Sequence, residues 1–227
     1  MKTGTCMIGG RSCAVFEQGA NGPVLYVGTG RDEAEAVAQK LAALTGDAAW
    51  RLVAFETENW NAYFSPWPAP AVFAREDFAG QAQQTLDWLI NECIPAVETD
   101  HRTVRGIAGY SLAGLFSLWA FYESGLFQGA ASCSGSLWYP GWKEYAQEHQ
   151  APAGSSVYLS LGDKEEKTRN RAMACVGDRT RWMAERLEAD EHILRHTLQW
   201  HAGGHFNEPD ARLAQGLAWL VSVLRPD

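Results

Sequence analysis

Apolar and polar residues follow two different periods along this chain, and the periods predict an order of elements. Five short runs of apolar and small residues have the pattern of strands buried on both faces of a sheet: 23–28, 51–56, 104–109, 129–134 and 156–162. Between them apolar residues recur every three or four positions, as Val37, Leu41 and Leu44 do, which indicates helices. A sixth strand is predicted over residues 196–200. Alternating strands and helices predict a mostly parallel sheet with helices on both faces.

The N-terminus and one long connection depart from this alternation. Two β-like runs within residues 5–18 are separated by a Gly-Gly-Arg turn, which predicts an N-terminal hairpin. Residues 57–74 are too rich in proline and tryptophan for a regular element, so we expect an irregular loop there. A long helix is expected from Phe78 onward, with Pro95 marking its end. Since no linker or internal repeat interrupts the pattern, residues 1–227 are expected to form a single domain.

Composition and charge narrow the classes of function. The net charge is −8 and there is no long basic run, so we expect neither nucleic acid nor a membrane surface as a partner. No apolar stretch approaches the roughly 18 residues of a membrane span. The N-terminus lacks the apolar core of a signal peptide, so a cytoplasmic location is expected. The five cysteines contain no CxxC pair, which favours buried thiols over disulfides or a metal site. The oligomeric state stays open.

Ser111 lies in the stretch GYSLAG, between a predicted strand and a helix expected over residues 112–124. In open parallel sheets the ligand site lies beyond the carboxyl ends of the strands. Gly109 and Ala113, at −2 and +2, leave room for the tight turn that pushes a nucleophilic serine clear of the sheet. The helix starting at Leu112 would direct its first amides toward an oxyanion. The alternative is an N-cap serine, but the position between a strand and an amphipathic helix favours a nucleophile.

A nucleophilic serine needs a base and an acid that orients the base. His205 follows the last predicted strand after a Gly-Gly pair that lets the loop curl back over the sheet, and it is favoured over His201 at the strand end. The segment after the fifth buried strand offers three carboxylates, Asp163, Glu165 and Glu166. The chain order Ser, acid, His is the order found in α/β-hydrolases.

A second oxyanion donor is expected from the loop after the first buried strand. The stretch GTGRDE supplies Thr29 and Gly30 at that position. A phosphate-binding loop is the alternative, but the stretch fits neither the GxGxxG pattern nor the GxxxxGK[ST] pattern. We therefore assign Thr29 and Gly30, together with Leu112, to a predicted oxyanion hole.

Three stretches of the chain resemble the putative esterase branch of the α/β-hydrolase superfamily: GYSLAGLFSLWAFYESGLFQGAASCSGSLWYPGW, VYLSLGDKEEKTRN and GGHF. That branch includes enterochelin-type siderophore esterases, S-formylglutathione hydrolase and feruloyl-esterase-like enzymes. The resemblance covers roughly residues 23–224. It implies an α/β-hydrolase fold and a Ser-His-acid hydrolase that needs no metal or cofactor. Because the chain leaves no room for a cap domain, we expect none.

The resemblance also bears on the acid. In relatives the acid commonly lies three residues after the glycine that ends its strand, and this position is Glu165 here. Asp163 stays open, because aspartate is the commoner acid in the wider superfamily. Some siderophore-esterase relatives work with a Ser-His pair and no clear acid, which implies that the third member can matter less here than in most triads.

Four tryptophans fall in loops on the predicted active-site edge. Trp60 and Trp67 follow the second buried strand, and Trp138 and Trp142 follow the fourth. Their rings either line a site for an acyl or aryl group, which we adopt as the expectation, or fill the core under the loops.

The predicted function is a serine hydrolase, of the carboxylesterase or thioesterase kind, that acts on a small to medium-sized ester through an acyl-enzyme. An acyltransferase or peptidase that uses the same triad is one alternative. A catalytically inactive hydrolase fold that serves as a binding protein is the other. The presence of a nucleophile, a base and an oxyanion glycine in one chain argues against the latter.

Overall fold

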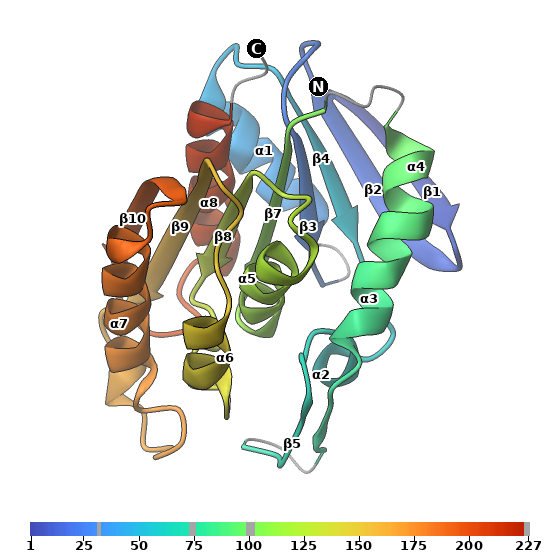
Figure 1. Ribbon diagram of the computed structural model, residues 1–227. Helices are drawn as coiled ribbons and strands as arrows, with labels where there is room; N and C mark the ends of the chain where they lie inside the picture. The colour runs from blue at the N-terminus through green and yellow to red at the C-terminus, as the bar shows by residue number, and fades with distance from the viewer. Residues whose placement is uncertain (31–32, 73–75, 99–102, 225–227) are drawn as a thin grey trace.

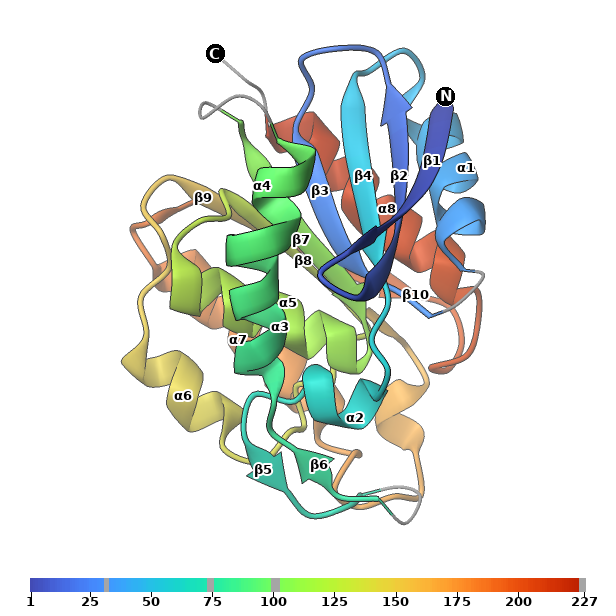
Figure 2. The ribbon, with the colours of Figure 1, turned by 90° about the vertical axis from the view of Figure 1, so that its right-hand side faces the viewer.

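The computed structural model describes residues 1–30, 33–72, 76–98 and 103–224. Within them the main sheet has eight strands in the order β1-β2-β4-β3-β7-β8-β9-β10 (Figures 1 and 2). Their bounds are β1 Lys2–Ile8, β2 Arg11–Gln18, β3 Val24–Gly28, β4 Trp50–Phe55, β7 Arg105–Tyr110, β8 Gly129–Cys133, β9 Ser155–Gly162 and β10 Ile193–His201. Strands β4, β3, β7, β8, β9 and β10 run parallel, and the predicted N-terminal hairpin is formed by β1 and β2. The hairpin joins the sheet by antiparallel pairing of β2 with β4.

Helices cover both faces of this sheet. The bounds of the longer ones are α1 Ala34–Thr45, α3 Ala82–Trp88, α5 Leu112–Ser124, α6 Trp142–Glu148, α7 Val176–Ala189 and α8 Pro209–Val223. Helices α1 and α8 pack together on one face, and α3, α5, α6 and α7 lie on the other (Figures 1 and 2). None of the described helices has the length and apolar character that a bilayer crossing requires. The expected mixed α/β architecture is therefore confirmed.

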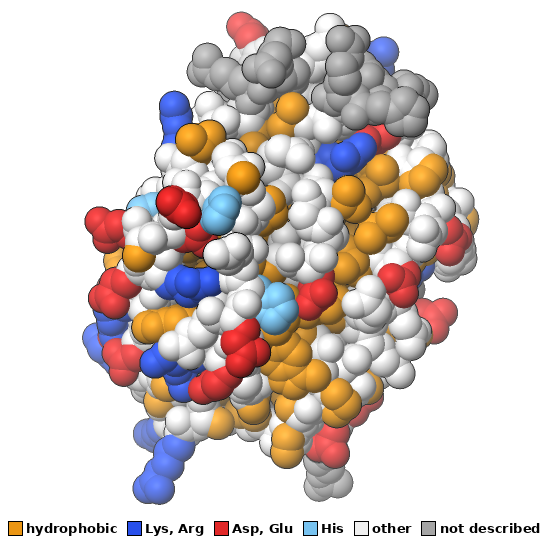
Figure 3. Space-filling view, viewed as in Figure 1, with side chains coloured by type: hydrophobic (Ala, Val, Ile, Leu, Met, Phe, Trp, Pro, Cys, Tyr) orange, Lys and Arg blue, Asp and Glu red, His pale blue; other side chains and the backbone are white. Residues whose placement is uncertain are grey.

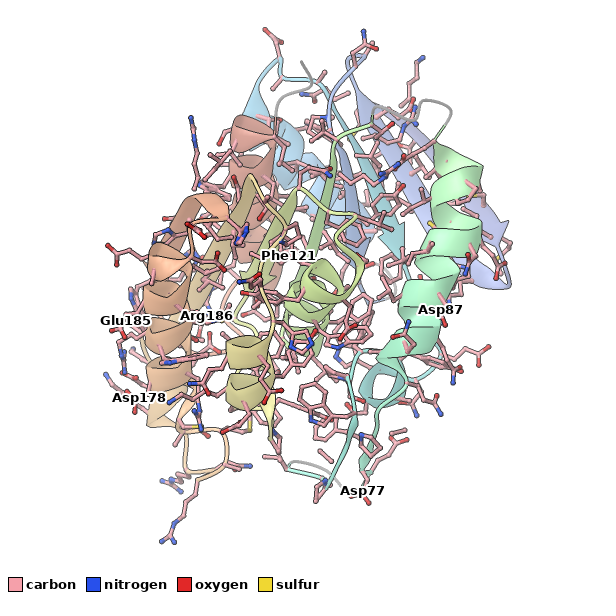
Figure 4. The ribbon with its side chains drawn as sticks, viewed as in Figure 1. Asp77, Asp87, Phe121, Asp178, Glu185 and Arg186 are labelled. Carbon is pink, nitrogen blue, oxygen red and sulfur yellow. The ribbon has the colours of Figure 1, made fainter. Side chains whose placement is uncertain are left out.

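Two hydrophobic cores, one on each side of the sheet, explain why β3 is apolar along its whole length. Along β3, Val24 and Tyr26 point into the core under α3 and α5, whereas Leu25 and Val27 point into the core under α1 and α8. Successive side chains of a strand point to opposite faces, so a strand covered on both sides favours apolar residues at successive positions. Figure 4 shows Phe121 inside the first core, and charged side chains such as Glu185 of α7 on the outside.

The region between β4 and β7 differs from the prediction. The expected loop 57–74 contains a short helix α2 (Trp60–Tyr63), and strand β5 (Pro68–Ala69) pairs with β6 (Phe78–Ala79). Asn59 starts α2 because its side-chain oxygen accepts the amide of Ala62 at 2.9 Å. Phe78 consequently lies in a strand, and helix α3 begins four residues later than expected.

Pro95 does not end the long helix. A π-helical turn (Leu89–Cys93) follows α3, and the chain continues as α4 (Ile94–Val97), with Pro95 in its first turn. Proline is tolerated in the first turn of a helix because the amide it lacks has no acceptor within the helix there. The prediction was wrong because a π-turn restarts the helix, and the apolar period does not reveal such a turn.

Candidate active site

Ser111 lies on a strained turn between β7 and α5. Its backbone has φ 60° and ψ −122°, a region that residues with a side chain rarely adopt and that costs about 1–3 kcal/mol. Gly109 makes the turn possible, since a Cβ atom there would lie 2.2 Å from the carbonyl oxygen of Ala113. The amide of Ser111 donates to the carbonyl of Cys133 on the next strand at 3.0 Å. The hydroxyl therefore stands at the carboxyl edge of the sheet, as expected for an exposed nucleophile.

His205 lies between Ser111 and Glu165 and contacts both. Its Nε2 atom is 3.0 Å from the hydroxyl oxygen of Ser111, and its Nδ1 atom is 2.7 Å from Oε2 of Glu165. The His205 side chain is 25% exposed and that of Glu165 is 5% exposed, so the imidazole reaches solvent while the carboxylate is buried. With Nδ1–H donating to the carboxylate, Nε2 is free to accept the serine proton.

The loop that carries His205 is held in place by its neighbours. Gly203 adopts φ 104°, and its amide donates to Oδ1 of Asp163 at 2.7 Å. The amide of Gly204 donates to the side chain of Asn207 at 2.8 Å. The hydroxyl of Tyr110 donates to the backbone carbonyl of His205 at 2.5 Å. Asp163, one of the alternative acids, therefore binds the loop backbone rather than the histidine ring.

The second carboxylate oxygen of Glu165 is also fully engaged. Oε1 accepts from the hydroxyl of Ser134 at 2.7 Å, from the amide of Gly162 at 2.8 Å and from Nη1 of Arg212 at 3.1 Å. The third candidate acid, Glu166, instead forms an ion pair with Arg181 at 2.6 Å. Of the three carboxylates proposed from the sequence, the structure brings Glu165 to His205.

The environment of Glu165 favours its charged form. Burial alone would raise the pKa of this carboxyl, but hydrogen bonds from His205 and Ser134 outweigh burial and hold the pKa below its usual value. Glu165 is thus an ionised carboxylate at neutral pH. A carboxylate can hold the histidine tautomer and stabilise the imidazolium that forms when the ring accepts a proton.

The predicted oxyanion hole is only partly available. Leu112 is the first residue of α5, where backbone amides lack an acceptor within the helix, and its amide adjoins Ser111. The amide of Thr29 donates to the carbonyl of Phe55 at 3.1 Å and extends the pairing of β3 with β4, so the assignment of Thr29 was wrong. The amide of Gly30 faces Oε2 of Glu33 at 3.0 Å and would have to exchange this partner for an oxyanion. The next amides of the loop, at 31–32, lie outside the described residues.

A pocket of about 250 Å³ opens beside His205. Its wall is largely apolar, formed by Trp138, Met173, Val176 and Phe206, with Lys164 also on its lining. Phe206 is 90% exposed and meets the ring of His205 edge-on at 5.2 Å. Figure 3 shows hydrophobic side chains reaching the surface below α5 and beside α6, toward the edge where the parallel strands end.

The four loop tryptophans have different roles. Trp138 lies on the lining of the pocket, and its assignment to the substrate site stays a prediction. Trp142 is fully buried and stacks on Tyr145 at 5.6 Å, so assigning it to the substrate site was wrong, and its ring fills the core. Trp60 packs against the ring of Phe64 at 4.7 Å, and Trp67 donates to the carbonyl of Pro140 at 2.7 Å. Neither Trp60 nor Trp67 is among the described residues that line the pocket. Their partly buried rings instead pack against the hydrophobic core beneath the loop.

A larger, more open hollow of about 530 Å³ lies between the ends of α1 and α8, away from Ser111. Small and aliphatic residues line it, among them Leu44, Ala48 and Val221, and none of the described residues on its lining is titratable. We therefore place the candidate active site at the smaller pocket, where the polar groups converge. No cluster of metal-ligating side chains occurs within the described parts of the chain.

Several residues of the site had not been predicted. Arg212, Tyr110 and Ser134 hold Glu165 and the His205 loop, and Met173 and Phe206 line the pocket. Phe206 could have been suspected, because it directly follows His205 in the stretch GGHF. Arg212 gave no such signal, since a lone arginine on an amphipathic helix is typical of a solvated face.

Comparisons with known proteins bear on the family and the fold of this chain. The sequence matches the family described as "Putative esterase" over residues 13–214. A search of curated proteins gave no match. Among solved structures, an IroE-like serine hydrolase from Shewanella oneidensis is similar, with a TM-score of 0.82 at 16% identity over 97% of this chain and 80% of that one.

Two further structures share the fold. The siderophore hydrolase EstA from Aspergillus nidulans has a TM-score of 0.74 at 14% identity, covering 97% of this chain and 94% of that one. The enterobactin esterase FES from Shigella flexneri has a TM-score of 0.66 at 17% identity, covering 97% of this chain and 59% of that one. At these sequence identities the similarity of the structures shows a shared fold.

Proposed function

Since this chain belongs to the Putative esterase family of the α/β-hydrolase superfamily and is an ester hydrolase, we propose that it cleaves a small to medium-sized ester with Ser111, His205 and Glu165 as its catalytic triad. The observation that carries the proposal is the position of His205, within hydrogen-bond distance of the Ser111 hydroxyl on one side and of the Glu165 carboxylate on the other. A binding protein would have no need of this arrangement on a strained turn.

The first half of the reaction forms an acyl-enzyme. His205 Nε2 takes the proton of Ser111 while the serine oxygen attacks the carbonyl carbon of the ester, and Glu165 stabilises the imidazolium. The carbonyl oxygen becomes an oxyanion next to the amide of Leu112 at the N-terminus of α5. His205 then gives its proton to the departing alcohol oxygen as the carbon–oxygen bond breaks.

The second half frees the serine. A water molecule loses a proton to His205 Nε2 and attacks the acyl carbon, and a second oxyanion forms at the same place. His205 returns the proton to the Ser111 oxygen as the bond between that oxygen and the acyl carbon breaks. An acid product leaves and the enzyme regains its starting state. The same triad would serve an acyltransferase or a peptidase, so analysis of the products with and without an added alcohol acceptor belongs to the test.

The substrate class follows from the pocket. Trp138, Met173, Val176 and Phe206 offer an apolar and aromatic wall beside His205, which suits an aryl or medium-chain group better than acetate. Two similar structures are described as a siderophore hydrolase and an enterobactin esterase, which adds a siderophore ester to the substrates worth testing.

A panel of p-nitrophenyl esters, thioesters and aryl esters tests this preference. We expect kcat/KM to rise from acetyl to aryl and medium-chain acyl groups. Phe206→Ala should raise KM for the larger esters about 5- to 30-fold, the equivalent of about 1–2 kcal/mol of lost apolar contact, and leave acetyl esters nearly unchanged. Leu194→Ala is the control, because it removes an exposed apolar side chain at a different place, on strand β10. An equal loss for all esters would contradict the assignment of Phe206 to the substrate site.

Three charge-neutral variants test the acid. Glu165→Gln should lower kcat by about 10²- to 10⁴-fold with little change in KM. A glutamine that keeps the three donors on its oxygen turns its NH₂ group toward Nδ1 of His205, which selects the wrong tautomer.

The other two acidic variants are the matched controls. Asp163→Asn should keep most activity because its oxygen still accepts the amide of Gly203, and Glu166→Gln should lose only an exposed ion pair. A fully active Glu165→Gln with an inactive Asp163→Asn would assign the acid to Asp163. Full activity in all three variants would indicate a Ser111–His205 dyad.

A further inference from the structure

Arg212 is a charged residue buried directly behind the candidate triad. It lies in the first turns of α8 and is 3% exposed. Arginine is almost never fully buried unless its charge is paired, because moving an unpaired cation out of water is costly. Its partners therefore indicate what the charge does.

The guanidinium group contacts the ends of four consecutive strands. Nη1 lies 3.1 Å from Oε1 of Glu165 after β9, 3.3 Å from the hydroxyl of Ser134 after β8 and 3.4 Å from the hydroxyl of Tyr110 at the end of β7. Nη2 donates to the carbonyls of Ala202 at 3.2 Å and Gly204 at 3.1 Å, in the loop after β10. These strands carry Ser111, Glu165 and His205, so one side chain ties together the segments that form the site.

From these contacts we propose that Arg212 is a positioning residue of the esterase, which fixes both partners of the hydrogen bond between Glu165 and His205. The proposal rests on the proposed function, because it assigns Arg212 a part in the reaction of that triad.

On the acid, Arg212 acts through the orientation of the carboxylate. Oε1 of Glu165 is held by Arg212, Ser134 and the amide of Gly162, and this leaves Oε2 to face Nδ1 of His205 at 2.7 Å. Nη1 contacts this carboxylate while Nη2 of the same planar group contacts the loop carbonyls, so the rigid guanidinium fixes where Oε1 lies relative to the loop that carries His205. Without it, the carboxylate can rotate and the hydrogen bond to the base weakens.

On the base, Arg212 acts through the loop backbone. The carbonyls of Ala202 and Gly204 lie on either side of Gly203, which adopts φ 104°. Glycine has more backbone freedom than other residues, so the loop can change conformation at this point. The two hydrogen bonds from Nη2 hold this stretch one residue before His205. Lysine, with three donors on a single nitrogen, could satisfy only part of this set.

The test compares Arg212→Met and Arg212→Lys with wild type in steady-state ester hydrolysis and thermal unfolding. We expect Arg212→Met to lower kcat by about 10²-fold with KM changed less than about threefold, and Arg212→Lys to lie between it and wild type. If Arg212→Met does not fold, Arg212→Lys carries the test with an expected tenfold loss of kcat, about 1.4 kcal/mol in barrier height. Wild-type kcat in the folded variants would overturn the proposal.

Arg105→Met is the matched control. Arg105 forms a partly buried ion pair with Glu98 at 2.6 Å, and it begins β7, the strand whose other end leads to Ser111. Removing it should lower the melting temperature and leave kcat unchanged. If Arg105→Met lowers kcat as much as Arg212→Met does, the effect is general destabilisation and the positioning role is overturned.

A double variant separates positioning from structure. If Arg212 acts through the hydrogen bond between Glu165 and His205, which Glu165→Gln already disrupts, adding Arg212→Met to Glu165→Gln should lower kcat by less than about threefold more, whereas a purely structural effect would multiply the two losses. A fluorophosphonate probe keeps the two proposals distinct. If the probe does not label Ser111 in the wild-type protein, both the proposed function and the role of Arg212 are overturned. If the probe labels Ser111 but the kcat losses of Arg212→Met and Glu165→Gln multiply in the double variant, only the role of Arg212 is overturned.

Discussion

Ser111→Ala is expected to lower kcat by about 10⁶-fold and to abolish labelling by a fluorophosphonate probe. The size of the loss follows from the arrangement, since nucleophile and base act as a unit and removing either leaves only the oxyanion donors and substrate binding. Ester hydrolysis and intact-mass labelling measure the two effects. Ser117→Ala is the control, because Ser117 lies on the same helix α5 with its buried hydroxyl bonded to the carbonyl of Ala113. Labelling of any other serine would contradict the assignment.

The same position predicts a stability effect that is independent of activity. Alanine keeps the Cβ atom and therefore the strain of a backbone at φ 60° and ψ −122°. Glycine takes this conformation without that strain, although it is more flexible in the unfolded chain. The free energy of unfolding of Ser111→Gly should therefore exceed that of Ser111→Ala by a net of roughly 1 kcal/mol. The glycine variant should accordingly have the higher melting temperature. An equal melting temperature would mean that the turn is relaxed in solution.

The order of strands and helices could be predicted because burial leaves a direct trace in the sequence. β3 is apolar or glycine along its length because its side chains are buried in two cores, one on each face of the sheet. The turn from β7 into α5 requires small residues, which also mark it in the sequence. The errors have local causes. The π-turn before Pro95 restarts a helix without disturbing the apolar period, and the short strand at Phe78 exists only because β5 pairs with it.

The candidate site could be predicted as far as it depends on strand ends. Ser111, Glu165 and His205 each follow a parallel strand, and the carboxyl ends of neighbouring strands meet at one edge of the sheet. What depends on tertiary contacts could not be predicted. Trp138 and Trp142 both follow β8 and both pack in the core, yet only Trp138 also reaches the pocket lining.

Hydrogen bonds between segments that are distant in the chain could not be predicted from the sequence either. The amide of Thr29 is taken by a carbonyl of β4, which no pattern in the loop reveals. The partners of Arg212 lie 8 to 102 positions away in the chain, so its role emerges only when four strands and α8 are assembled.

His205→Ala is expected to match Ser111→Ala, with a loss of about 10⁶-fold in kcat, and the double variant should be no worse than either single one. The contrast with His201→Ala makes this test specific. His201 is the last residue of β10, and its Nε2 atom is buried with no hydrogen-bond partner among the described residues. Burial, and then the nearby charge of Arg212, lower the pKa of His201, so its ring is neutral at pH 7.

The contact that His201 does make uses its backbone, whose carbonyl accepts the amide of Asp163 at 2.8 Å, and alanine preserves it. His201→Ala should therefore keep kcat within about threefold of wild type and lose at most about 1–2 kcal/mol of stability from the missing ring. The rate of fluorophosphonate labelling provides a second measurement, because His205→Ala retains Ser111 but leaves it without a base. If His201→Ala proved inactive and His205→Ala active, the base would be the histidine at the strand end, and the loop geometry around Gly203 would have no part in the reaction.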